Sequence, residues 1–192
     1  MTLVALCNGR ILAGSTFIDD HAVLLDGARI AEVVPAADIP AEAQRHDLAG
    51  DSLLPGFIDT QVNGGGGVLF NDAPTVETIR TIGAAHRQYG TTGFLPTLIS
   101  DDLEVVAAAL AAVDQGLRDG VPGLLGIHIE GPFLSTDRKG VHDPAKFLPL
   151  TDEHLSLLQP LASGVTMMTV APEQADPERI RTLAKRGIIV SL

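Results

Sequence analysis

The sequence has 192 residues, of which 13 are basic and 24 acidic, so its formal net charge is -11. This balance argues against a nucleic-acid-binding protein, because no basic stripe is available to neutralise phosphates. Hydrophobic residues make up 45% and charged residues 19%, which is typical of a globular domain. Cys7 is the only cysteine, so no internal disulfide is possible. Without a signal-like start or a long apolar run, we expect a cytoplasmic protein that does not enter the membrane.

Residues 1–52 are predicted to form short strands. The apolar segments 22–25 and 28–34 flank Asp26-Gly27, a pair typical of a hairpin with a type I′ turn because it tolerates positive φ. Two further strands are expected on either side of Asn8-Gly9, at residues 3–6 and 10–12. No residue pattern in this region indicates a catalytic or binding role. We expect a small module that resembles a β-sandwich.

Beyond residue 52 the pattern changes to strands that alternate with helices. Helical spacing of apolar residues is clearest in segment 103–117, with Asp101 as the expected cap. Thr151 and Pro177 are expected at the starts of two later helices. The alternation predicts βα units on a parallel sheet. Apolar runs place five strands, which begin near Leu53, Gly93, Gly123, Val165 and Gly187.

The sequence ends at residues 187–192, within the fifth predicted strand. A (β/α)8 barrel needs eight strands. We therefore expect residues 53–192 to form the first part of such an α/β barrel, about five strands with an open edge.

The segment from Ile127 to Phe133 carries the clearest chemical signal. It predicts a buried strand that ends in Glu130 and breaks into a Gly-Pro turn. His128 and Glu130 share one face of that strand, because residues two apart point the same way. Imidazole and carboxylate groups at a strand end suit a divalent metal ion. Spacing alone equally allows a structural histidine and a carboxylate in an ion pair.

Three segments together resemble one known family. The strings HIEGPF at residues 128–133 and KGVH at 139–142 are similar to the HxEGPF and KGxH segments of N-acetylglucosamine-6-phosphate deacetylases, members of the amidohydrolase superfamily. The string PGFIDTQVNG at 55–64 resembles that family's PGFIDxQxNG. Their order and spacing make the resemblance specific, and it covers the whole chain as the first half of a longer protein. It implies an amidohydrolase barrel.

The resemblance also implies roles for particular residues. It maps the family's metal-binding glutamate onto Glu130 and its substrate contacts onto Val141 and His142. The family pattern does not need His128 as a ligand, so we expect its ring to orient a neighbouring polar group. No catalytic residue is expected within this chain, because the family's acid/base aspartate would lie beyond Leu192.

Gln61 and Asn63 share a face at the end of the first predicted barrel strand. Many amidohydrolases carry His-x-His there and bind a second metal. The resemblance therefore implies a single divalent ion, zinc or iron, with Gln61 and Asn63 beside it. A plain strand-end role is the alternative for Gln61. The run Gly64–Gly67 lacks the lysine of a P-loop and is expected to make room for a ligand.

The implied reaction is hydrolysis of the acetamide of N-acetyl-D-glucosamine 6-phosphate, giving D-glucosamine 6-phosphate and acetate in amino-sugar breakdown. The full-length protein is expected to be a homodimer. Two metal-binding histidines of the family would also lie beyond Leu192, so we expect the 192-residue chain alone to be inactive. Two alternatives remain. One is a related amidohydrolase that acts on N-acetylgalactosamine 6-phosphate or resembles dihydroorotase. The other is a non-catalytic half-barrel that binds a partner.

Overall fold

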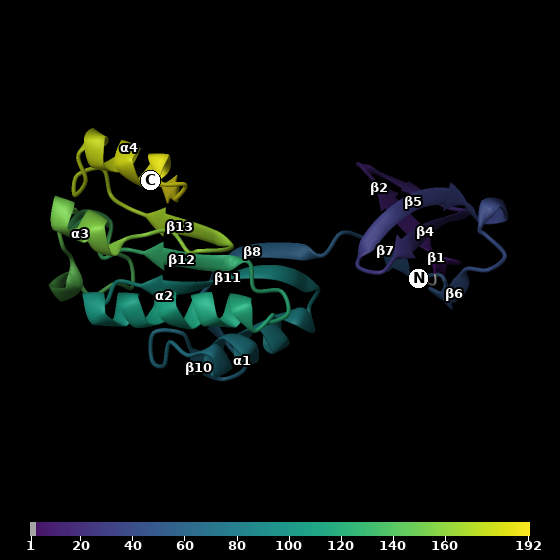
Figure 1. Ribbon diagram of the computed structural model, residues 1–192, viewed down its shortest axis with the longest axis horizontal. Coiled ribbons are helices and arrows are strands. Elements are labelled where there is room, and N and C mark those ends of the chain that lie inside the picture. The colour runs from purple at the N-terminus through teal and green to yellow at the C-terminus, as the bar shows by residue number, and fades with distance from the viewer. Residues whose placement is uncertain (1–2) are drawn as a thin grey trace. The chain divides into compact units, whose positions relative to one another are not determined.

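A computed structural model describes residues 3–192 (Figure 1). The chain divides into two compact units, residues 1–55 and 56–192. Residues 1 and 2 of the first predicted region lie outside the described residues. Every helix within residues 3–192 is too short or too polar to cross a membrane.

The first unit contains two small sheets. One has the strand order β5-β4-β1-β6, and the other has the order β3-β2-β7. Their core consists of small aliphatic side chains, among them Ala5, Ala22 and Leu24. A short 3-10 helix, η1 (Ala36–Asp38), follows β5. The strands are β1 (Leu3–Cys7), β2 (Arg10–Ala13), β3 (Thr16–Ile18), β4 (His21–Asp26), β5 (Arg29–Pro35), β6 (Gln44–Asp47) and β7 (Ser52–Leu53).

Strands β4 and β5 form the predicted hairpin, but its turn differs from the expected one. Asp26 pairs with Arg29, so the two loop residues are Gly27 and Ala28. Only Gly27 has a positive φ, +58°. A type I′ turn needs positive φ at both loop residues, so the predicted turn type was wrong. Leu53 was also misplaced, because it lies in β7 and pairs with β2 of this unit.

The second unit is built on a parallel five-stranded sheet with the order β14-β13-β12-β11-β8. Helices connect its strands, which confirms the predicted βα rhythm and the partial barrel. Its strands are β8 (Phe57–Val62), β11 (Thr91–Ile99), β12 (Gly126–Glu130), β13 (Val165–Thr169) and β14 (Ile189–Ser191). The helices are α1 (Val76–Arg87), α2 (Leu103–Arg118), α3 (Asp152–Leu157) and α4 (Pro177–Lys185), with the 3-10 turns η2 (Thr136–Arg138) and η3 (Pro144–Lys146).

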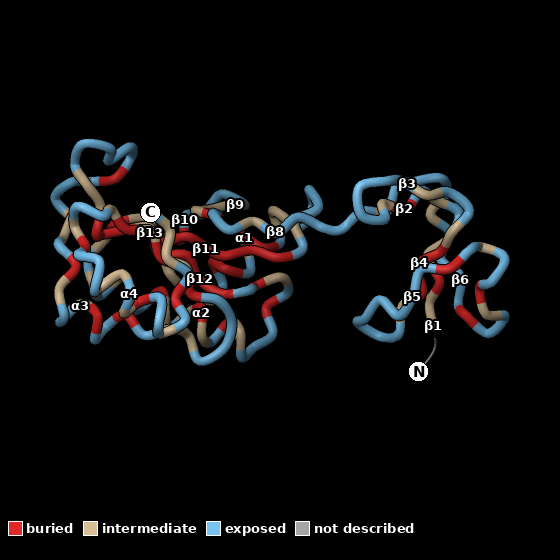
Figure 2. Tube along the Cα trace, turned by 90° about the horizontal axis from the view of Figure 1, so that it is seen from above, coloured by how far each residue is buried: buried red, intermediate tan, exposed pale blue. Residues whose placement is uncertain are grey.

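The core of this unit lies between the sheet and its helices. Helix α1 packs on β11, and α2 packs on β12. Val106, Ala109 and Val113 recur on one face of α2 and are buried, as helical periodicity requires. The strands β11 and β12 are buried almost throughout (Figure 2). This continuous burial is typical of parallel strands covered on both faces.

Two helix starts match their predictions and one does not. The Oγ1 atom of Thr151 accepts a hydrogen bond from the main chain of α3, and Pro177 is the first residue of α4. Helix α2 has Asp102 as its N-terminal flanking residue, where the sequence predicted Asp101. The Oδ1 atom of Asp101 instead accepts from the N–H of Asp102.

The glycine run forms a small hairpin. Gly64–Gly65 is strand β9, which pairs with β10 (Val68–Leu69). The two turn residues between them, Gly66 and Gly67, have φ values of +64° and +84°. A Cβ atom on Gly65 would lie 2.9 Å from the ring of His86 on α1. Gly65 and Gly66 thus accommodate helix α1, and the expected room for a ligand stays a prediction.

Candidate metal and substrate site

Glu130 is the last residue of β12 and lies at the carboxyl end of the sheet. The parallel register pairs it with Ile99, the last residue of β11, and with Thr169, the last residue of β13. The Nε2 atom of Gln61 donates a hydrogen bond to Glu130 Oε2 at 3.0 Å. The Nε2 atom of His142 lies 3.7 Å from Glu130 Oε1. Two of the predicted residues thus converge on this carboxylate.

The chain turns sharply after Glu130, and glycine is required at the next position. Gly131 has φ +90°, a value that side-chain-bearing residues rarely adopt. A Cβ atom there would also lie 2.1 Å from Ser100 Oγ. The glycine of the HIEGPF segment therefore allows the loop after β12 to pass close to the end of β11.

His142 lies in the loop between η2 and η3 and is only 6% exposed. Its Nδ1 atom is 2.8 Å from Ser100 Oγ, and the main-chain N–H of Ser100 donates to the same nitrogen at 3.3 Å. The preceding residue, Val141, is 86% exposed. The loop therefore holds an imidazole inside the site and leaves an apolar side chain at its surface.

A cavity of about 360 Å³ joins the predicted residues. Gln61, Asn63, Glu130, Val141 and His142 all line it. A larger cavity of about 820 Å³ shares Glu130, Val141 and His142 and extends along the loop after β12. Both volumes are in the range of small-molecule sites. The structure thus brings five of the six predicted site residues to one place, and their chemical roles stay predictions.

His128, the sixth predicted residue, lies within the sheet and is 4% exposed. Its Nδ1–H donates to the carbonyl oxygen of Thr60 at 3.0 Å, and its Nε2 lies 2.8 Å from Thr169 Oγ1. Burial lowers the pKa of His128 and outweighs the opposing effects of Glu130 and the Thr60 carbonyl. A neutral ring with both nitrogens engaged connects β8, β12 and β13, so it is not available to a ligand.

Two residues near the site were missed by the sequence reasoning. Ser100 holds His142, as described above. The side chain of Asn71 bonds to both main-chain groups of Ile99: Oδ1 accepts from its N–H at 3.0 Å and Nδ2 donates to its carbonyl at 3.1 Å. The available signal was the polar run Ser100-Asp101-Asp102 immediately after an apolar strand, since strand ends of a barrel carry function.

The described residues supply only part of a metal site. Within residues 3–192, no three His, Cys, Asp or Glu side chains gather closely enough to hold an ion. Glu130 is a suitable carboxylate ligand at the mouth of a cavity, and Gln61 occupies one of its two oxygens. Catalytic zinc sites usually take three protein ligands. The described residues therefore supply one suitable ligand of a divalent ion, Glu130, and not a complete set.

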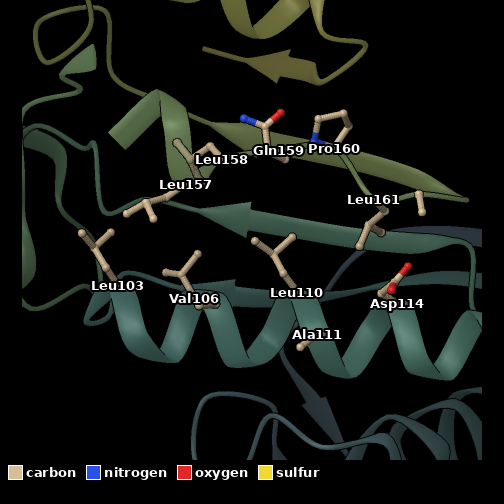
Figure 3. A pocket seen from close by; sticks show the side chains of 12 residues that line it. Leu103, Val106, Leu110, Ala111, Asp114, Leu157, Leu158, Gln159, Pro160 and Leu161 are labelled. Atoms are coloured by element: carbon tan, nitrogen blue, oxygen red, sulfur yellow. The ribbon is translucent and has the colours of Figure 1, made fainter. Parts of the chain in front are cut away.

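A separate cavity of about 370 Å³ lies between α2 and residues 157–162 (Figure 3). Side chains such as Leu103, Leu110 and Leu161 line it. Asp114 is the one ionisable residue among those lining it, and it pairs with Arg118 one turn along α2. The remaining lining residues of this cavity are apolar apart from Gln159, so it offers fewer polar groups to a ligand than the strand-end cavities.

Comparison with known families gives two matches that together cover nearly the whole chain. Residues 3–53 match the NagA composite domain, and residues 52–188 match the Amidohydrolase family. Both matches confirm the resemblance seen in the HIEGPF, KGVH and PGFIDTQVNG segments.

Individual proteins are also similar. An N-acetylgalactosamine-6-phosphate deacetylase of Shewanella sp. (strain ANA-3) is 46% identical over 157 residues, which cover 82% of this chain and 40% of that protein. An N-acetylglucosamine-6-phosphate deacetylase of Haemophilus influenzae is 37% identical over 188 residues, covering 98% of this chain and 49% of that protein. The chain therefore spans half or less of the length of these relatives.

Solved structures show the same likeness. The crystal structure of an N-acetylglucosamine-6-phosphate deacetylase from Pasteurella multocida superposes with a TM-score of 0.92 at 34% identity. The match covers 99% of this chain and 50% of that one. The match thus extends over nearly all of this chain and over half of that protein.

Proposed function

The chain belongs to the amidohydrolase family, and we propose that the protein it represents hydrolyses the acetamide of N-acetyl-D-glucosamine 6-phosphate to D-glucosamine 6-phosphate and acetate. The named activities of the Haemophilus and Pasteurella relatives support this substrate. The observation that carries the proposal is the convergence of Gln61 and His142 on Glu130 at the end of β12. That position is where barrel enzymes keep their catalytic groups.

Amidohydrolases generally depend on divalent metal ions, and the proposal assigns one such ion, zinc or iron, to Glu130. When bound, the ion supplies polarisation of the acetamide carbonyl and a more acidic water. Gln61 holds Glu130 Oε2 at 3.0 Å, which orients the other carboxylate oxygen toward the cavity. The further metal ligands and the acid/base aspartate belong to parts of the enzyme outside residues 3–192.

The remaining site residues act on the substrate. His142 presents a ring nitrogen beside Glu130, where it hydrogen-bonds a substrate oxygen, and exposed Val141 covers an apolar part of the sugar. Gln61 and Asn63 replace the His-x-His that would bind a second ion, so a single metal ion suffices. Because the net charge of -11 repels an anionic phosphate, local groups of the site hold it.

N-acetyl-D-galactosamine 6-phosphate is the second candidate substrate. It is favoured by the Shewanella relative, which is 46% identical and is named for that activity. The two sugars differ in the configuration of one ring hydroxyl, so they use the same acetamide chemistry. The residues that bind that hydroxyl decide between them.

The test measures acetate release from both sugar phosphates by the protein produced from its intact gene. We expect turnover that dialysis against a chelator removes and added zinc restores. The ratio of the two kcat/KM values identifies the preferred sugar. Absence of acetate from both sugars, in protein supplemented with zinc and in protein supplemented with iron, would contradict the proposal and favour a non-catalytic half-barrel that binds a partner. Acetate release by a purified chain of verified 192-residue mass would contradict the assignment of the missing ligands.

We further propose that the enzyme is a cytoplasmic homodimer. The one cysteine among these 192 residues suits a reducing compartment, and dimers are common in the family that the chain resembles. Size-exclusion chromatography with light scattering on the intact gene product measures the oligomeric state. A monomeric mass would contradict the dimer.

A further inference from the structure

Ser100, which follows β11 directly and is 7% exposed, makes the hydrogen bonds to the ring of His142. Ser100 approaches the Nδ1 atom of the ring in two ways. Its Oγ atom lies 2.8 Å from Nδ1, and its main-chain N–H points at the same nitrogen across 3.3 Å. Both groups therefore contact the Nδ1 side of the imidazole.

This contact determines which ring nitrogen carries hydrogen. A main-chain N–H is only a donor, so the Nδ1 atom that it meets must present a lone pair. A neutral imidazole has one N–H and one lone pair. The hydrogen therefore lies on Nε2, which is 3.7 Å from Glu130 Oε1 at the cavity.

We propose that Ser100 is a positioning residue that fixes the Nε2–H tautomer and the orientation of His142. His142 then meets substrate as a hydrogen-bond donor and not as a base. The group it binds is an oxygen with a free lone pair, such as a carbonyl, hydroxyl or phosphate oxygen of the sugar phosphate. This assignment rests on the proposed function for its substrate, but the tautomer is a property of the free protein.

Two neighbouring contacts show that the position of Ser100 is tightly specified. Gly131 leaves the space that the Ser100 hydroxyl occupies, since a Cβ there would lie 2.1 Å from Oγ. Asn71 binds both main-chain groups of Ile99, which fixes the direction of the next N–H along the chain. The end of β11 is thus held from both sides, and the donor aimed at Nδ1 is preorganised.

The experiment records ¹⁵N signals of the histidine rings in protein from the intact gene, labelled with ¹⁵N-histidine and loaded with zinc, a diamagnetic ion. Loss of signals in His142→Gln assigns that ring. In the unsubstituted protein we expect a protonated Nε2 and an unprotonated Nδ1. In Ser100→Ala, which keeps the main-chain N–H, Nδ1 stays unprotonated but its signal shifts because the hydroxyl contact is lost, and kcat/KM falls about tenfold. Ser100→Thr keeps the hydroxyl and restores both readouts.

Ser156→Ala is the matched control, because Ser156 is an exposed serine of α3 whose hydroxyl bonds only within that helix. A protonated Nδ1 in the unsubstituted protein, or an unchanged ring signal in Ser100→Ala, overturns the inference. If Ser100→Ala fails to fold, the signals of the unsubstituted protein and of Ser100→Thr still decide. A protein with the expected tautomer but no deacetylase activity would remove the proposed function and leave the positioning role in place.

Discussion

Two histidines, His128 inside the sheet and His142 at the strand-end cavity, are almost equally buried. They differ in how many ring nitrogens have a hydrogen-bond partner in the protein. His128 is 4% exposed and uses both nitrogens on other strands, through the Thr60 carbonyl and the Thr169 hydroxyl. His142 is 6% exposed and uses one nitrogen on Ser100, while the other faces Glu130 and a cavity. Burial alone therefore does not distinguish a structural histidine from one that meets a ligand.

What separates the two regions is the number of ring nitrogens that the fold leaves free. A buried polar atom must find a partner, and inside the sheet neighbouring strands supply one on each side of His128. At the carboxyl end the strands stop, so within residues 3–192 only the Nδ1 atom of His142 has a hydrogen-bond partner, and Nε2 lies 3.7 Å from Glu130 Oε1 at the cavity. The comparison predicts that substitutions in the interior affect stability and that substitutions at the strand end affect chemistry.

Glu130→Gln gives the largest expected effect and tests the strand-end side of the comparison. The amide keeps a carbonyl acceptor for Gln61 but loses the negative charge that a metal ion needs. We expect kcat/KM to fall about a thousandfold or more, since metal polarisation supplies several kcal/mol, while the free energy of unfolding of the metal-free protein changes little. Steady-state kinetics, metal analysis by mass spectrometry and urea unfolding measure the three quantities.

The matched control for this change is Glu104→Gln, because Glu104 is an exposed carboxylate of α2 that lies outside the cavities described above. It should retain metal and activity. A Glu130→Gln protein with full metal content and normal kcat/KM would show that the strand end does not hold the ion.

His128→Leu tests the interior side. Leucine fills much of the same space but leaves the Thr60 carbonyl and the Thr169 hydroxyl without the ring. We expect the free energy of unfolding to fall by about 2–4 kcal/mol, measured by urea unfolding beside Glu104→Gln, which should stay within about 0.5 kcal/mol. A stability equal to that of the unsubstituted protein would break the comparison, because the interior network would then contribute nothing.

The sequence was sufficient for features that depend on neighbours along the chain. The apolar run before Glu130 predicted a strand and placed His128 on its face, and Thr151 was recognised as a helix cap because its partner lies three residues away. Motifs in the HIEGPF and KGVH segments pointed to Glu130 and His142 together. For the strand and the cap the physical cause lies within a few residues of the observation, whereas Glu130 and His142 were assigned through the family resemblance of those segments.

Contacts between residues far apart in the chain could not be predicted from the sequence. Ser100 meets His142, 42 residues later, and Asn71 clamps Ile99, 28 residues later, so both depend on the register of parallel strands and on loop paths. The Gly64–Gly67 run had the same difficulty. The sequence predicted room for a ligand there, and the approach of His86 on α1 to Gly65 is not visible in it.

Asp101→Asn gives the smallest expected effect. It tests how much a side chain of the strand-end region, one residue beyond Ser100, contributes to stability. Burial acts to raise the pKa of Asp101, but hydrogen bonds from the N–H of Asp102, from Asn71 and from Lys146 outweigh it and hold that pKa below 3.8. The folded state therefore favours the carboxylate. Its stabilising contribution is complete above the unfolded-state pKa and is lost as pH falls through the lower folded-state value.

At neutral pH we expect Asp101→Asn to lower the free energy of unfolding by about 1 kcal/mol. Urea unfolding at a series of pH values should show this difference from the unsubstituted protein staying constant down to about pH 5 and shrinking below the unfolded-state pKa. A difference that persists unchanged at low pH would mean that the carboxylate charge is not what stabilises this loop. A loss as large as that of His128→Leu would erase the distinction between the two regions, since an open strand-end network would then stabilise the fold as strongly as the closed network inside the sheet.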